Sequence, residues 1–146
     1  MAEYEQIGIT IPKPILEQVD RRGKWRSTII GRDLGRYYSL LRHTLNDMPF
    51  RLAEVMLLCD ALNGVIITPE TVSLLADEVE AAIREDRLDE KWQIDGKEFV
   101  ARLRALNRLE ATAVVDGVEL VWEDVSGGGA TVDMEAAIRR VFVIRD

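Results

Sequence analysis

The opening of this chain carries the feature that most constrains its fold, an isolated alternation of apolar side chains. Isoleucine recurs at every second position, at Ile7, Ile9 and Ile11, which is the period of a half-buried β-strand. Nothing immediately after this segment is typical of a hairpin partner. Because an unpaired strand leaves its backbone N–H and C=O groups unsatisfied, we expect the same strand of a second copy to pair with it.

Two helices are predicted directly after this strand. Ile15, Leu16 and Val19 recur at helical spacing behind a proline that suits a first helical turn. Ser27 is a favourable N-cap for the second helix. The apolar residues of that helix recur at steps of four, three and four, and they are Ile30, Leu34, Tyr37 and Leu41. The predicted order is therefore strand, helix, turn and helix.

This order resembles the ribbon-helix-helix family of prokaryotic DNA-binding proteins over about residues 5–42. Three coupled features carry the resemblance: an apolar residue and a proline end the strand, an apolar-Asp pair ends the first helix, and an Arg-Ser pair opens the second. Here they are Ile11-Pro12, Val19-Asp20 and Arg26-Ser27. The resemblance implies an intertwined homodimer, joined through its N-terminal strands, whose two-stranded ribbon enters the major groove of duplex DNA.

The resemblance also implies a set of DNA contacts. Gln6, Gly8 and Thr10 would face the base edges, where glutamine pairs with adenine and threonine offers a hydroxyl or a methyl group. Phosphates would be contacted at the positive end of the second helix, by Lys24, Arg26, Ser27 and Thr28. The alternatives are a solvated strand face and a Ser27 that only caps its helix.

Charge is distributed unevenly along the chain. Residues 1–43 hold eight basic and five acidic side chains, a balance of +3, whereas residues 44–146 hold eleven and twenty-one, a balance of −10. A segregated chain can present a basic face to nucleic acid while its acidic part points away. An excess of three charges is also compatible with ordinary fluctuation.

The fold class predicted for the whole chain is mainly α. A ribbon-helix-helix module of one strand and two helices in residues 1–43 precedes an all-α domain of unknown role in residues 44–125. A Gly-rich break and a short helix or tail fill residues 126–146, and this tail is expected to dock on its own domain. Helix boundaries are signalled by Asn63-Gly64, Thr68-Pro69, Asp95 with Glu98, and Asn107 with Glu110.

One segment of the helical domain is ambiguous. Residues 111–122 place Asp116-Gly117 between β-branched runs, which is a signal for a hairpin turn. Asn107 is a helix cap just before the segment, and apolar residues of the segment fall on one side of a helix. We therefore favour a helix here, with the hairpin as the alternative.

The three tryptophans are expected to have different environments. Trp92 and Trp122 sit in apolar company and are predicted to belong to the core of the helical domain. Trp25 lies in the turn of a module too small to bury it. We expect it to pack against the C-terminal domain, with a position beside bound DNA as the alternative.

Residues for catalysis or metal binding are scarce. The chain has a single histidine, His43, at the end of a helical run, and a single cysteine, Cys59, in an apolar run typical of a buried thiol. No spacing of ligands predicts a metal site, and no motif predicts a cofactor. No apolar run is long enough for a membrane span, and no secretory signal opens the chain. We expect a cytoplasmic protein that is not an enzyme.

Two functions remain in view. The first is a dimeric, sequence-specific DNA-binding transcriptional regulator, acting as a repressor or an antitoxin-like autoregulator. The alternative is a dimeric adaptor that does not bind DNA, in which the acidic helical domain binds a protein partner.

Overall fold

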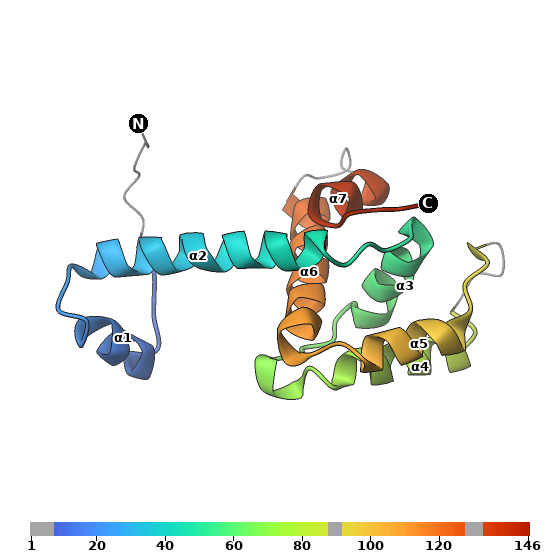
Figure 1. Cartoon of the computed structure of the whole chain (residues 1–146), viewed down its shortest axis with the longest axis horizontal. Helices are drawn as coiled ribbons and strands as arrows, with labels where there is room; N and C mark the ends of the chain where they lie inside the picture. The colour runs from blue at the N-terminus through green and yellow to red at the C-terminus, as the bar shows by residue number, and fades with distance from the viewer. Residues whose placement is uncertain (1–7, 88–91, 128–132) are drawn as a thin grey trace. The chain divides into compact units, whose positions relative to one another are not determined.

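The computed structural model describes residues 8–87, 92–127 and 133–146, and the chain forms two compact units (Figure 1). The N-terminal unit is Met1–Ser39 and the C-terminal unit is Leu40–Asp146. The boundary falls inside one long helix, α2 (Arg26–Asn46), which contributes residues to both units. Each unit is described by itself below.

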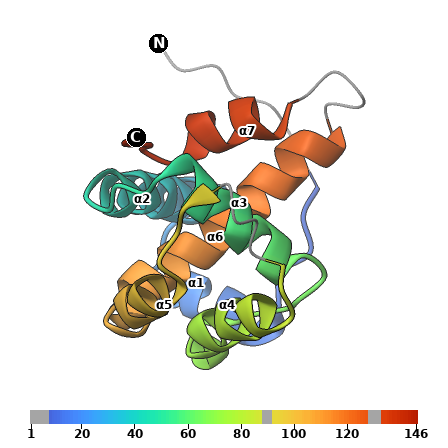
Figure 2. The same ribbon diagram turned by 90° about the vertical axis from the view of Figure 1, so that its right-hand side faces the viewer.

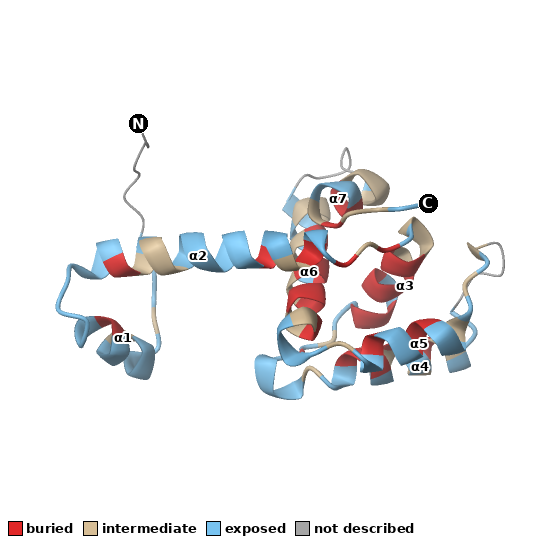
Figure 3. Cartoon of the chain, in the orientation of Figure 1, coloured by how far each residue is buried: buried red, intermediate tan, exposed pale blue. Residues whose placement is uncertain are grey.

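The N-terminal unit is built from α1 (Lys13–Asp20) and the first part of α2. Pro14 lies in the first turn of α1, where a missing backbone N–H costs nothing, so the predicted helix is confirmed. Buried apolar side chains among the described residues of this unit are Val19 and Ile29. Figure 3 shows that most of α1 and of the first part of α2 is exposed.

The predicted N-terminal strand is wrong. Residues 8–11 contain no strand, Gly8, Ile9 and Thr10 are exposed, and the described residues contain no β-sheet. An alternating pattern specifies a strand only when a second extended segment pairs with its backbone. The described residues of this unit contain no such segment. The ribbon of the predicted fold class is thus replaced by an all-helical architecture, and Gln6 and Ile7 lie outside the described residues.

The C-terminal unit is a set of helices packed around α3 and α6. Helix α3 packs on α4, α6 and α7, while α4 packs on α5 and α6 packs on α7 (Figure 2). The elements of this unit after α2 are α3 (Leu52–Leu62), the 3-10 turn η1 (Pro69–Thr71), α4 (Leu74–Arg84), α5 (Gly96–Arg104), α6 (Arg108–Gly127) and α7 (Met134–Val141). The all-helical prediction for this region is confirmed.

Local capping signals explain where several helices begin and end. Asn107 and Glu110 form a reciprocal capping box, in which each side chain accepts a hydrogen bond from the other residue's backbone N–H, at 3.0 and 2.8 Å. Asp95 caps α5 through a 3.1 Å bond from the backbone of Glu98. Gly64 ends the α3 region at a φ of +77°, the left-handed conformation that glycine tolerates best. Thr68 precedes η1 and not α4 itself, which begins later than predicted.

The ambiguous segment is helical, as favoured from the sequence. Gly117 lies in the middle of α6, and a Cβ atom built there would meet Phe142 Cζ at 2.8 Å and Leu45 Cδ1 at 3.3 Å. The glycine therefore serves close packing inside a helix, although the same dipeptide is a common turn signal.

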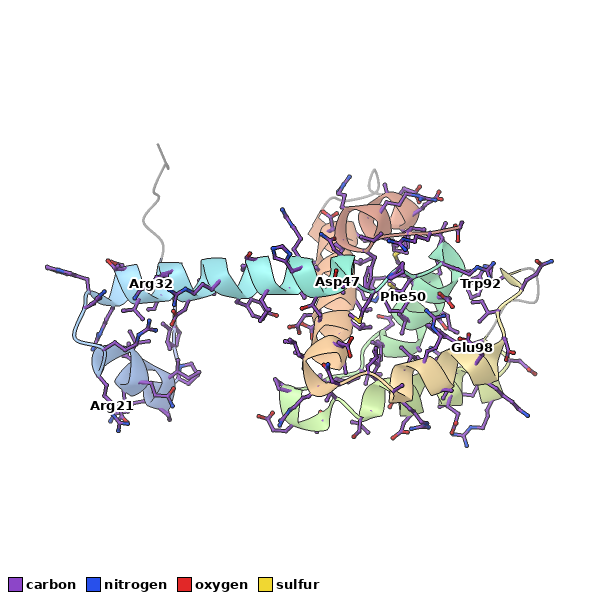
Figure 4. All side chains as sticks on the ribbon, viewed as in Figure 1. Arg21, Arg32, Asp47, Phe50, Trp92 and Glu98 are labelled. Atoms are coloured by element: carbon purple, nitrogen blue, oxygen red, sulfur yellow. The ribbon has the colours of Figure 1, made fainter. Side chains whose placement is uncertain are left out.

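The end of the chain docks on the C-terminal unit, as predicted. Phe50 pairs with Ile144 in an isolated parallel bridge, and its backbone bonds with Val143 and Arg145 at 3.1 and 2.9 Å. The ring of Phe50 meets those of Phe99 and Phe142 edge to face, with centroids 6.4 and 5.8 Å apart. Figure 4 shows Phe50 between the surrounding helices.

Two further side-chain predictions are confirmed in this unit. Trp92 and Trp122 are half-buried against the core, and the Trp122 indole N–H donates to the backbone oxygen of Cys59 at 3.1 Å. Cys59 is a buried free thiol.

None of the helices within the described ranges is both long and apolar enough to span a membrane.

Candidate nucleic-acid interface

The turn between α1 and α2 brings most of the predicted phosphate contacts together. Gly23 lies at the turn with a φ of +68°, and its backbone N–H donates to the carbonyl oxygen of Asp20 at 3.1 Å. Helix α2 starts at Arg26, two residues earlier than a Ser27 cap requires, and its first helical bond runs from the Ile29 N–H to the Trp25 carbonyl. Ser27 is therefore a first-turn residue and not the N-cap.

Positive charge is concentrated in this turn. Residues 20–28, which we call the cationic turn, contain one acidic side chain and four basic ones, Arg21, Arg22, Lys24 and Arg26. Their excess of three equals the excess of the whole stretch 1–43. The positive charge of the N-terminal part of the chain thus lies where α2 begins.

Two of these cations are held in place by carboxylates. Arg26 makes a bidentate pair with Asp20 at 2.8 and 2.9 Å, and Arg22 reaches Asp33 on α2 at 2.7 Å. The hydrogen bonds from Arg26 lower the pKa of Asp20, and the same bonds raise the pKa of Arg26. These pairs fix the geometry of the turn more than they add stability, because they are exposed to solvent.

The other two cations are available to a ligand. Arg21 and Lys24 are exposed and form no ion pair with any residue in the described ranges. Figure 4 shows the Arg21 side chain projecting from the end of α1. A phosphate approaching the turn would therefore meet two solvent-exposed cations.

The first turn of α2 is open to an anion. The backbone N–H groups of Arg26, Ser27 and Thr28 precede the first helical hydrogen bond, and the turn contains no acidic residue. The side chains of Ser27 and Thr28 are exposed. No group in the described ranges accepts a hydrogen bond from these backbone donors, which lie at the positive end of the helix dipole.

The predicted base contacts are placed differently. Gly8 and Thr10 lie in the exposed segment before α1, and Thr10 has no hydrogen-bond partner among the residues described. Gln6 lies outside the described residues. The structure thus groups Lys24, Arg26, Ser27 and Thr28 in one turn, while it describes Gly8 and Thr10 as part of an extended approach to α1.

An ion pair in the C-terminal unit, between a buried carboxylate and a partly exposed guanidinium, was not predicted from the sequence. Glu54 is 4% exposed, and its carboxylate accepts from the Arg51 backbone at 2.8 Å and from Arg102 Nη1 at 2.6 Å. The Arg102 guanidinium also lies over the rings of Phe50 and Phe99. A glutamate at the third position of a helix whose other residues, apart from Asp60, are apolar was the available signal. With both carboxylate oxygens bonded to protein groups, the pair is structural.

Other chemistry is sparse in the part of the chain that the structure describes. Burial raises the pKa of the Cys59 thiol to about 12, which keeps it protonated and unreactive. No cluster of three potential metal ligands occurs within the described ranges. A groove of about 470 Å³ lies between α4 and α5. Its lining is apolar at Ile83, Gly96, Val100 and Ala101 and charged at Glu80, Arg84, Lys97 and Arg104.

Comparison with known proteins leaves the geometry as the basis for function. No family model matches the chain, and no curated protein and no solved structure is significantly similar to it.

Proposed function

We propose that this chain is a homodimeric DNA-binding transcriptional regulator, a repressor or antitoxin-like autoregulator, whose N-terminal unit contacts the DNA. The observation that carries the proposal is the cationic turn at the open first turn of α2. Arg21 and Lys24 supply unpaired charge, and the backbone donors from Arg26 to Thr28 supply hydrogen bonds. This is the combination that recognises a phosphate of duplex DNA.

Dimerisation is supported by the apolar surface of the N-terminal unit. A unit of this size cannot stabilise itself with the few buried apolar side chains described for it. Besides Trp25, five large apolar residues in the described part of this unit are more than 40% exposed, namely Ile9, Ile15, Leu34, Tyr37 and Tyr38. A second copy that covers these residues completes the core and doubles the positive charge presented to DNA.

A buried donor in α2 supports the same conclusion. The Nε atom of Arg32 is buried and has no hydrogen-bond partner within the described residues. Buried donors are almost always satisfied in folded proteins. A second copy that packs on this unit is a source of the missing acceptor.

The proposal is tested by binding to duplex DNA at several salt concentrations. We expect the chain to bind the DNA upstream of its own gene with an affinity that falls steeply with salt. Lys24→Ala should lower affinity for all sequences and reduce the salt slope by about 2, because each of two copies loses about 0.9 released counterions. Lys97→Ala, at a matched exposed lysine on α5, should leave the slope unchanged. An equal effect of the two variants would contradict the proposal.

Sequence preference is tested separately. Thr10 is exposed and has no hydrogen-bond partner among the described residues, and we propose that it contacts a base together with Gln6, which lies outside them. The double variant Gln6→Ala with Thr10→Ala should reduce discrimination between the upstream site and a scrambled duplex while the dimer survives. A loss of affinity that is equal for both duplexes would remove these residues from base readout.

The adaptor function is the second candidate, and the groove between α4 and α5 favours it. Its lining joins apolar side chains to three cations and one acid, Arg84, Lys97, Arg104 and Glu80, and Arg104 pairs with Glu80. The remaining cations, Arg84 and Lys97, suit an amphipathic peptide with acidic flanks. A dimer that fails to bind its upstream DNA or mixed duplex at low salt would support this function in place of DNA binding.

A further inference from the structure

We propose that Trp25 packs its indole ring on the sugar–phosphate backbone of DNA, beside the phosphate bound at the first turn of α2. The proposal deepens the DNA-binding function and rests on it. Trp25 is 84% exposed, whereas Trp92 and Trp122 are half-buried against the core. The N-terminal unit therefore does not bury this ring, as its small size predicts. A tryptophan left this exposed retains a large apolar surface for a partner.

The backbone of Trp25 is anchored although its side chain is free. Its carbonyl oxygen accepts the first helical hydrogen bond of α2, from the N–H of Ile29 at 3.1 Å. Ile29 is fully buried, so this bond ties the residue to the core of the N-terminal unit. The ring therefore projects from a fixed point next to the open donors, and only its two side-chain torsions must be ordered on binding.

The surroundings of the ring select a polyanion with apolar faces. Trp25 lies between Lys24 and Arg26 in the cationic turn, whose net charge is +3. The backbone of duplex DNA combines regularly spaced phosphates with the apolar faces of its sugars, on which an aromatic ring can pack. Anionic lipid shares the charge but is bound by helices that present a continuous apolar face. Trp25 is instead followed by the exposed polar residues Ser27 and Thr28, so DNA is the better fit.

Fluorescence of the full chain tests the contact. The difference in emission between the wild type and Trp25→Leu reports on this ring without changing the two half-buried tryptophans. We expect the difference spectrum of the free dimer to be that of a solvated indole, and addition of a short upstream duplex to quench it. A second reporter, Trp92→Phe, should give the same quenching because it retains Trp25.

Affinity supplies the second readout. Trp25→Ala should weaken binding at least about fivefold, because the apolar ring surface that the DNA backbone would cover is lost. The salt slope should stay as in the wild type, because no charge is removed. Trp25→Phe should recover part of the loss. This pattern differs from that of Lys24→Ala, which changes the slope.

Each contrary result has a distinct meaning. Salt-dependent DNA binding with an unquenched Trp25 and full affinity of Trp25→Ala would overturn the ring contact and leave the proposed function standing. A difference spectrum that is already blue-shifted in the free dimer would place the ring between the two copies, which also overturns it. Failure to bind any duplex would remove both proposals, and a blue shift on vesicles of phosphatidylserine and phosphatidylcholine would then assign the ring to lipid.

Discussion

Arg102 donates a hydrogen bond of 2.6 Å to Glu54, and this pair joins the start of α3 to α5 across 48 residues of sequence. The carboxylate is buried at the start of α3, while the Arg102 side chain is 41% exposed and covers the faces of Phe50 and Phe99. The guanidinium therefore neutralises a buried charge and shields an aromatic cluster at the same time.

Removing this arginine should destabilise the C-terminal unit strongly. Arg102→Ala leaves the Glu54 carboxylate buried without its main partner, and we expect the free energy of unfolding to fall by about 1.5–3 kcal/mol. Urea denaturation followed by circular dichroism measures the change. Arg104→Ala is the matched control on the same helix, since its partners Asp77 and Glu80 are exposed, and it should cost much less. Equal losses for the two variants would show that the buried pair has no special role.

The close approach at Gly117 predicts an unusual response to alanine. A methyl group there would meet Phe142 at 2.8 Å, so Gly117→Ala should lower the free energy of unfolding by about 1–3 kcal/mol despite the better helix propensity of alanine. Gly127→Ala, in the last turn of the same helix with nothing within 4 Å, should cause no loss. Thermal denaturation of the two variants compares them directly. A stabilised Gly117→Ala protein would refute the packing role.

Signals that depend on neighbouring residues were predicted well from the sequence. The capping box of Asn107 and Glu110 and the left-handed Gly64 involve groups within a few positions of each other, so propensity alone identifies them. The pairing of Glu54 with Arg102 depends on how α3 and α5 pack, which no local pattern contains. Gly117 shows how a local signal can mislead. The Asp-Gly dipeptide is common in hairpin turns, but here the glycine allows close packing inside a helix.

The errors at the N-terminus have a different cause. The alternation that ends at Ile9 and Ile11 has the period of a strand, but a strand needs a second strand to pair with. The described residues of one copy contain no such strand. Trp25 is exposed in its own unit, which agrees with the prediction that this module is too small to bury it. Its exposure follows from the cationic turn around it, where the neighbouring side chains are polar. The polar composition of the turn can be read from the sequence, but composition alone does not say which side chains are buried.

The buried thiol provides a probe of unfolding. Because burial raises the pKa of Cys59 to about 12, the nucleophilic thiolate is scarce at pH 8 in the folded protein. We expect Ellman's reagent to react negligibly with the native chain and to modify one thiol per chain in urea. The labelling midpoint should follow the unfolding transition of the C-terminal unit. Rapid labelling without denaturant would contradict the burial of Cys59.

The acidic side chains on α6 predict that neutralising one of them increases the stability of the protein in a pH-dependent way. Desolvation, followed by repulsion from Asp116 and Glu123, raises the pKa of Glu119 from its usual 4.5. The ionised carboxylate is thus disfavoured in the folded state, so this group's contribution to stability falls as the pH rises through the raised pKa. Glu119→Gln should therefore stabilise the protein by about 0.2–0.5 kcal/mol at pH 7, and the gain should vanish at pH values where Glu119 is protonated.

A carboxylate on α7 serves as the control for this gain. Glu135 pairs with Arg139 at 3.1 Å, four residues further along α7, so Glu135→Gln should reduce stability at pH 7 by about 0.2–0.5 kcal/mol. Chemical denaturation at several pH values compares the two variants. The same sign of change in both would attribute the effect to overall net charge and not to the local environment of each carboxylate.

A carboxylate placed at the start of α2 separates helix stability from DNA binding. Ser27→Asp puts a negative charge at the positive end of the helix, where it should stabilise α2 by about 0.3–1 kcal/mol. The same charge repels an adjacent phosphate by about 1 kcal/mol per copy in water, so a dimer should lose about tenfold or more in affinity for DNA.

Ser73→Asp, at the start of α4 in the C-terminal unit, adds the same charge away from the proposed interface and should leave affinity unchanged. Because the two effects of Ser27→Asp have opposite signs, a weakened complex cannot be attributed to a melted helix. Titration of duplex DNA monitored by anisotropy, beside thermal denaturation, measures both, and undiminished affinity would place the phosphate elsewhere.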